Sequence, residues 1–381
     1  MPLPVLAHGF RPFFFLAGCW AALAMVLWLG LLHGGIALPT ALAPPLWHAH
    51  ELVFGYGVAV LSGFLLTAIP NWTGRLPISG APLAALALLW LAGRLAVAVS
   101  GWIGAVPAGV VDTAFLATLL GFVAREIFAG RNWRNLPVLV ALMLLTLANA
   151  LSHSADDALA AYGLRGGIAV LAALIGLIGG RIVPSFTRNW LAKRGATELP
   201  APFGTIDRLM LAFLPAALLL WVVAPVWPGT GVVAGCAGMV TLLRLGRWRT
   251  PATAPEPLVW VLHLGYLWLG IGLGLIAAGP AWGISPIAAV HALTAGAIAT
   301  MTLAVMTRAS LGHSGRALHA DVGTALIYIL VTAAALARLA AHAFAPHYAE
   351  LIDIAGALWI AAYTLFAVRY APVLLTDRKA G

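Results

Sequence analysis

The stretch Trp47–Arg75, WHAHELVFGYGVAVLSGFLLTAIPNWTGR, places two histidines and a glutamate at the start of a long apolar run. The run from His50 to Ile69 is long enough for one helix to cross a bilayer core of about 30 Å. Polar side chains are costly beside lipid, so His48 and His50 need a compensating partner. The stretch therefore predicts a membrane helix with a binding site at one end.

The whole chain has the composition of an integral membrane protein. Of its 381 residues, 62% are hydrophobic and 9% are charged, whereas soluble domains carry about 25% charged residues. The net charge is +9, but the basic residues are scattered between apolar runs, so nucleic acid is not an expected partner. Cys19 and Cys236 lie in apolar segments without metal-binding spacing and are expected to be packing residues.

Twelve apolar runs have the length of membrane spans, about 17 to 25 residues. Short turns rich in glycine and proline separate most of them. The predicted spans are Phe13–Leu32, His50–Ile69, Ala81–Ser100, Val106–Val123, Leu136–Leu151, Tyr162–Gly180, Ile206–Val226, Gly229–Leu245, Leu258–Ala278, Ile287–Met306, Val322–Ala341 and Glu350–Ala367. The first run lacks a small-residue cleavage site and is predicted to span rather than to be removed. The longer connection Arg181–Arg208 is a candidate for a short surface helix.

The basic residues predict the orientation of these spans. With the N-terminus inside, 18 of the 21 lysines and arginines fall in inner segments, as the positive-inside rule requires. The exceptions, Arg94, Arg165 and Arg338, lie within a span or near its outer end. We therefore expect a single polytopic membrane domain over residues 1–381, with both termini in the cytoplasm.

A weak repeat of four helices runs along the chain. His50 precedes Arg75 by 25 positions in the second span, and His291 precedes Arg316 by 25 positions in the tenth. The end of the sixth span, RIVPSFTRN, parallels TAIPNWTGR, although this span has no histidine. Spans two, six and ten all run from outside to inside, which predicts a pseudo-threefold architecture. The predicted units are residues 10–125, 135–245 and 258–370.

The predicted orientation places His48, His50 and His291 at the outer side. Within a helix, His48 and His50 point about 200° apart and therefore do not bind one ion together. Two histidines from two spans suit axial ligation of a haem iron, and Glu51 is placed to orient an imidazole through its second ring nitrogen. Arg165 lies at the same level and is a candidate partner for a haem propionate. The alternative is that these residues only cap helices or anchor the interface.

A second group of histidines falls at the inner side. His291 and His313 are 22 residues apart, about 33 Å along a helix, so the two groups form separate sites. The inner group is a candidate metal site, with copper the natural ion for imidazole ligands, or it is solvated. Its members are His8, His263, His313 and His319. The histidines expected to be solvated in outer loops are His33, His153, His342 and His347.

Several motifs together resemble the NnrS family of bacterial membrane proteins. They are HGFRPFF, the Trp47–Arg75 stretch, GGRIVPSFTRNW and HALTAGAIATMTLAVMTRASLGHSGR. The resemblance implies an inner-membrane protein that contains haem and copper and is associated with nitric oxide and nitrosative stress. It implies no settled reaction. A haem-dependent oxidoreductase acting on nitric oxide or a nitrosyl species, with an unidentified electron donor, is one candidate.

The four-helix repeat is also similar to the main subunit of haem–copper oxidases, in which histidines from spans two and ten hold a low-spin haem. His50 and His291 occupy those places and are the preferred axial ligands of a haem b, with His48 as the alternative or as part of a second centre. The sixth span lacks the histidine of the oxidase copper centre, so a binuclear site of that kind is not expected. This likeness concerns architecture, and function must be argued from the site.

Two functions of other kinds remain open. Many transporters with twelve spans contain internal repeats, but the spans here hold few ionisable groups, with Arg94 the main exception. An assembly factor that passes haem or copper to a reductase would use the same histidines for transient binding.

Overall fold

The computed structural model describes residues 3–377, and in this part the chain is helical without strands. Twelve of the described helices are long and apolar enough to cross a membrane. The predicted fold class, an all-α integral membrane protein with twelve spans, is confirmed.

Most spans are single helices. These are α1 (Phe10–Leu32), α4 (Ala81–Ala98), α6 (Ala105–Ala129), α7 (Leu136–Ser152), α10 (Thr205–Val223), α11 (Pro228–Gly246), α12 (Pro257–Trp282), α15 (Val322–Ala343) and α16 (Tyr348–Leu375). Short helical pieces lie between or before them, namely η1 (Pro4–Leu6), α5 (Ser100–Ile103), η3 (Trp133–Asn135), η5 (Thr250–Thr253) and η7 (Ala345–His347).

The second, sixth and tenth spans each contain a π-helical segment between two α-helices. The second span is α2 (Pro44–His50), η2 (Glu51–Gly57) and α3 (Val58–Thr73). The sixth is α8 (Asp157–Leu174), η4 (Ile175–Gly179) and α9 (Gly180–Ala192). The tenth is α13 (Pro286–His291), η6 (Ala292–Ile298) and α14 (Ala299–His313).

The π segments lie in the three spans that the sequence repeat singles out. In spans two and ten the segment is seven residues long and begins directly after a histidine, His50 or His291. π turns are rare in proteins and are frequent at functional sites. The two histidines therefore share a local backbone setting, while the threefold order itself stays a prediction.

Several spans extend beyond their predicted ends, among them the second and the sixth. The second span begins at Pro44, six residues before His50, because two prolines suit the first turn of a helix. The sixth span continues to Ala192. The helix expected in the long connection after Arg181 is therefore the continuation of a span.

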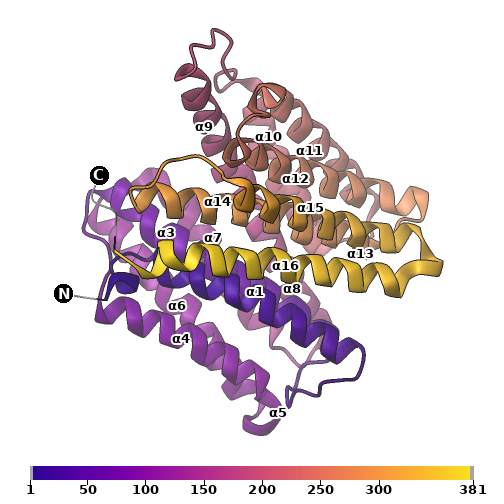
Figure 1. Cartoon of the computed structure of the whole chain (residues 1–381). Coiled ribbons are helices and arrows are strands. Elements are labelled where there is room, and N and C mark those ends of the chain that lie inside the picture. Colours follow the sequence, from indigo (N-terminus) through magenta and orange to yellow (C-terminus); the bar gives the residue numbers. More distant parts are fainter. Residues whose placement is uncertain (1–2, 378–381) are drawn as a thin grey trace. The chain divides into compact units, whose positions relative to one another are not determined.

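The chain divides into two compact units. Unit 1 consists of Met1–Val170, Arg308–Ala317 and Tyr363–Gly381, and unit 2 of Leu171–Thr307 and Leu318–Ala362. In unit 1, α1 packs on α3, and α6 packs on α4 and α7; in unit 2, α11 packs on α10 and α12, as Figure 1 shows. The residues of the candidate site described next all belong to unit 1.

Candidate functional site

Four spans of unit 1 bring polar side chains into one buried group, which we call the polar cluster. Its members are His50 and Glu51 at the α2–η2 junction, Arg94 on α4, Asp112 on α6, Asn149 on α7 and His153 just after α7. They lie near the start of the second span, the end of the third, the start of the fourth and the end of the fifth. Consecutive spans that run in opposite directions place these positions at one level.

One carboxylate oxygen occupies the centre of the polar cluster. Asp112 Oδ2 lies 3.2 Å from His50 Nε2 and 3.0 Å from His153 Nε2. The two imidazole rings are 4.7 Å apart between centroids. Asn149 Nδ2 donates a hydrogen bond of 2.9 Å to the same oxygen. His50, Asp112 and His153 each offer one ligand atom within 4.8 Å of the others, which is close enough to hold a metal ion.

A guanidinium connects this centre to a second carboxylate. Arg94 Nη1 donates to Glu51 Oε1 at 2.7 Å, and Arg94 Nη2 donates to Asp112 Oδ1. Glu51 Oε1 also lies 3.2 Å from His50 Nδ1. One guanidinium therefore faces two carboxylates, so the cluster carries a net negative charge while its imidazoles are neutral.

The polar cluster is almost closed to solvent. The His50, Glu51 and Asp112 side chains are at most 2% exposed, and that of His153 is 10% exposed. Desolvation is the main reason that the pKa of His153 falls from 6.5 to about 3, and the neighbouring His50 and Arg94 lower it further. His153 is therefore neutral at physiological pH, and neutral imidazole is the form that binds metals.

Glycines allow the helices to approach closely around the polar cluster. A Cβ atom on Gly93 would lie 2.9 Å from Asp112 Oδ1, and one on Gly109 would lie 3.0 Å from the His153 side chain. At Gly55 of η2 a Cβ would lie 2.7 Å from Trp20 Nε1 and 2.9 Å from both Arg94 Nη1 and Glu51 Oε2. Larger residues at these positions would push the polar groups apart.

Several buried atoms of this region have no hydrogen-bond partner among the described residues. They are Trp20 Nε1, His50 Nε2, Glu51 Oε2 and Arg94 Nε. A buried polar atom left in this state costs about 1–3 kcal/mol. The concentration of such atoms at one place is typical of a site that binds something.

The other predicted outer residues lie apart from this centre. The His48 ring stacks on Trp28 at 4.5 Å, so His48 and His50 take different directions, as their spacing predicted. His291 belongs to unit 2, where its Nδ1 lies 2.8 Å from the Ile287 carbonyl oxygen and its ring 6.3 Å from that of His342. The joint haem ligation by His50 and His291 stays a prediction.

Arg165 and the inner histidines have other neighbours. The Arg165 guanidinium lies 5.2 Å from the centre of the Tyr162 ring. His8 and His313 flank the ring of Phe10 in unit 1, with ring centroids 6.1 and 5.6 Å away. The pairing of Arg165 with a haem propionate and the binding of a metal by His8 and His313 stay predictions.

The inner histidines of unit 2 are engaged by side chains. His263 Nε2 and Nδ1 lie 2.8 Å from the hydroxyls of Thr187 and Thr250. His319 Nδ1 lies 2.7 Å from Glu256 Oε2. Both ring nitrogens of His263 are thus occupied, which favours a structural role, and the metal role of the inner group stays a prediction.

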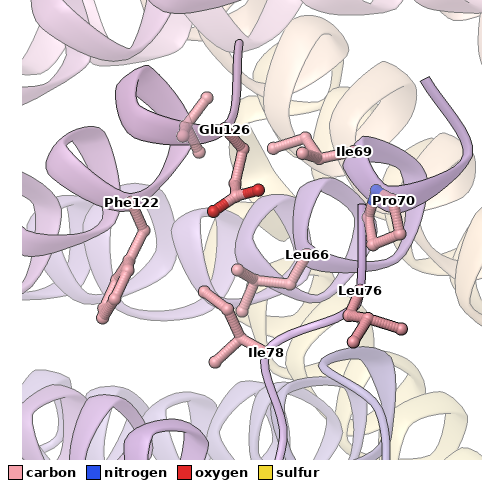
Figure 2. Close-up of a pocket in the computed structure, with 8 residues that line it drawn as sticks. Leu66, Ile69, Pro70, Leu76, Ile78, Phe122 and Glu126 are labelled. Atoms are coloured by element: carbon pink, nitrogen blue, oxygen red, sulfur yellow. The ribbon is translucent and has the colours of Figure 1, made fainter. Parts of the chain in front are cut away.

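A separate apolar pocket lies in unit 1 between the ends of spans two and four. Figure 2 shows Glu126 among the apolar side chains that line it, including Leu66, Ile69 and Phe122. The Glu126 carboxylate pairs with Arg75 and, at 2.8 Å, with Arg125 Nη2. Two arginines already balance the charge of this carboxylate, whereas the polar cluster has an excess negative charge. The polar cluster is therefore the better candidate site.

Comparison with known families agrees with the motifs. The family model described as NnrS protein matches residues 4–378. The chain belongs to the NnrS family. No curated protein matches it. The NnrS match extends over every residue of the polar cluster and over both histidine-led π segments.

Two residues at the centre of the site of this NnrS member, Asp112 and His153, were not predicted as site residues from the sequence. His153 was expected to be solvated because charged residues follow it in the loop, and the structure corrects this expectation by burying its ring against Asp112. A signal was present in the sequence. An aspartate inside an apolar span must have a polar partner, and Arg94, Asn149 and His153 lie at the matching depth of neighbouring spans.

Proposed function

We propose that this chain is a haem- and copper-containing protein of the bacterial inner membrane that acts in the response to nitric oxide. Its chemistry would be nitric oxide binding, redox conversion or relief of iron–nitrosyl stress. Membership of the NnrS family supports the physiological part of this proposal. The two histidines that lead π segments support the cofactor part.

The observation that carries the proposal is the second contact made by each of these imidazoles. His50 Nδ1 faces a carboxylate oxygen of Glu51, and His291 Nδ1 faces the carbonyl oxygen of Ile287. Metal-ligating histidines almost always donate their other ring N–H to a carboxylate or a backbone carbonyl, which fixes the ring and its tautomer. In both residues Nδ1 therefore carries the proton, and Nε2 keeps the lone pair that can bind a metal.

The two histidines differ in what their Nε2 atoms can hold. His291 fits an axial ligand of a haem, because the Ile287 carbonyl holds its ring through Nδ1. His50 Nε2 lies 3.2 Å from Asp112 Oδ2, so a haem iron on His50 would require the imidazole to leave this carboxylate. When bound, haem supplies one-electron chemistry and a binding place for nitric oxide.

The test is a reduced-minus-oxidised visible spectrum of the detergent-purified protein, with iron and copper analysis. The parent is compared with His50→Ala and His291→Ala. His263→Ala is the matched control, because it removes a buried histidine that two threonines already engage. We expect sharp reduced bands in the parent and the control, and their loss in His291→Ala. Loss in His50→Ala as well would assign both histidines to one haem.

Nitric oxide titration of the reduced protein follows. We expect the haem bands to shift in the parent and not in a variant that has lost the haem. A folded parent that binds neither haem nor copper would overturn the proposal.

The polar cluster also supports the alternative that this chain is a transporter. Ionisable groups buried in membrane spans mark ion and substrate paths. A folded parent without cofactors would favour this alternative. Cofactor lost readily during purification would instead favour an assembly factor.

A further inference from the structure

We propose that His50 Nε2, Asp112 Oδ2 and His153 Nε2 bind one divalent first-row transition metal ion, and that Glu51, Arg94 and Asn149 are positioning residues for this site. The inference builds on the proposed function, which calls for a metal, and gives that metal three ligands. It also replaces His291 as the partner of His50 by Asp112 of the fourth span and His153 at the end of the fifth.

The spacing of the donor atoms carries the first step. Asp112 Oδ2 is 3.2 Å from one imidazole nitrogen and 3.0 Å from the other. Bonds from a transition metal to imidazole nitrogen and carboxylate oxygen are about 2.0–2.2 Å long. Donors about 3 Å apart can therefore share one ion with small side-chain movements.

The orientation of His50 carries the second step. Its Nδ1 faces Glu51 Oε1, and its buried Nε2 has no hydrogen-bond partner among the described residues although Asp112 Oδ2 is near. Two acceptors on either side of one neutral imidazole cannot both receive a proton from it. A cation between His50 Nε2 and Asp112 Oδ2 resolves this conflict.

The carboxylate ligand is oriented in the same manner. Asn149 Nδ2 donates to Asp112 Oδ2, and Thr113 Oγ1 donates to Asn149 Oδ1, which fixes the direction of the amide. Arg94 holds the other oxygen of Asp112. Ligands held by such outer contacts keep their geometry without the ion, and loss of an outer contact typically lowers metal affinity 10–100-fold.

Charge supports a cation at this place. Two carboxylates, Glu51 and Asp112, share the single guanidinium of Arg94, and all three side chains are at most 3% exposed. An uncompensated charge inside a membrane protein is costly. A bound cation offsets the excess negative charge, as would a proton on one imidazole, and the experiment separates these two cases.

The donor set defines the class of metal. Two imidazoles and one carboxylate form the ligand set of non-haem iron(II) sites with open coordination positions, and copper and zinc also accept imidazole. Calcium and magnesium prefer oxygen ligands throughout. Three protein ligands leave room for a further small ligand, as in catalytic rather than structural sites.

The experiment measures metal bound per protein in the full-length chain in detergent. The protein is stripped with a chelator and reloaded with iron(II) without oxygen, with copper(II) or with zinc(II). The variants are Asp112→Asn and His153→Ala. The control is Asp207→Asn, which removes a buried aspartate of unit 2 that pairs with Arg244 and Arg247. Asn149→Ala tests positioning.

We expect one tightly bound equivalent of at least one ion in the parent and in Asp207→Asn, and none in Asp112→Asn or His153→Ala. Asn149→Ala should keep one equivalent with affinity lowered 10–100-fold. Copper(II) in the parent should show electron-spin resonance couplings to imidazole nitrogen, and this signal should be absent from His153→Ala. The thermal unfolding midpoint and size-exclusion elution report whether these variants fold, and their haem content should not change.

Three results would overturn the inference. The first is a folded parent that takes up none of the three ions, and the second is equal uptake by the parent and all variants. The third is loss of haem from His50→Ala with metal content unchanged, which would return His50 to the haem and leave the proposed function standing. If Asp112→Asn does not fold, His153→Ala at the edge of the cluster decides alone.

Discussion

At the scale of single residues, Asp112 organises the candidate site. Its Oδ1 accepts from Arg94, and its Oδ2 faces His50, His153 and the Asn149 amide. No neutral residue reproduces all four relations, because each depends on an oxygen that carries negative charge. Arg94 is its necessary complement.

Replacing Arg94 tests this dependence. Arg94→Gln leaves Glu51 and Asp112 buried without a guanidinium, and removing one partner of a buried ion pair costs about 3–5 kcal/mol. We expect a clear fall in the thermal unfolding midpoint, partly reversed by added metal ion. Arg338→Gln, which removes an arginine whose partners are His342 and Tyr348, should change the midpoint less. An equal fall in both variants would show that Arg94 stabilises the protein no more than Arg338 does.

The close approach at Gly55 makes a second prediction. A Cβ there meets Trp20 Nε1, Arg94 Nη1 and Glu51 Oε2 at 2.7–2.9 Å, and overpacking typically costs about 1–3 kcal/mol. Gly55→Ala should therefore lower both thermal stability and metal affinity. Gly121→Ala on α6 is the control, because a Cβ there has no neighbour within 4 Å. A harmless Gly55→Ala would contradict the tight packing described.

At the scale of elements, two of the π segments, η2 and η4, receive hydrogen bonds from neighbouring spans. Trp90 Nε1 donates to the Gly55 carbonyl of η2 at 3.1 Å. In unit 2, Arg244 donates to the carbonyls of Gly176 and Gly180, at and beside η4, at 3.2 Å each. Wide turns that expose carbonyls inside a membrane protein require such donors. The π geometry is thus part of the tertiary structure.

A one-residue deletion tests the role of η2. Removing Leu52 should favour an α-helical turn and change the directions of His50 and Glu51 relative to α3. We expect the deletion to abolish metal binding, measured by metal analysis, while Leu52→Ala retains it. Retained binding in the deletion variant would mean that η2 does not set the direction of His50.

At the scale of the whole molecule, the alternation of twelve spans places the polar cluster at the predicted outer side. This orientation is tested by cysteine labelling in a background with Cys19→Ala and Cys236→Ala. Ala155→Cys, in the loop after His153, should react with a membrane-impermeant maleimide in cells whose outer membrane is permeable. Ser79→Cys should react only after the inner membrane is opened. The reverse pattern would invert the topology.

The number and place of the spans were predictable because hydropathy along the chain reports them directly. The divergence of His48 from His50 was predictable from helical spacing. The partners of His50 were not, because they depend on which spans pack together, and this is decided by contacts such as Gly93 against Asp112. His153 was predicted to be solvated from its loop neighbours alone, and this prediction was wrong because its ring packs against Asp112.

The near-complete enclosure of the polar cluster bears on the lifetime of any ion held there. His153 is the most exposed residue of the cluster, with about a tenth of its side chain accessible, so an ion would enter or leave through a local opening beside His153 at the end of the fifth span. Such local opening is infrequent where side chains are deeply packed. Chelators and added ions should then act slowly on the folded protein, so that stripping and reloading require long incubation. The proposed centre would exchange its ion slowly with a free metal pool.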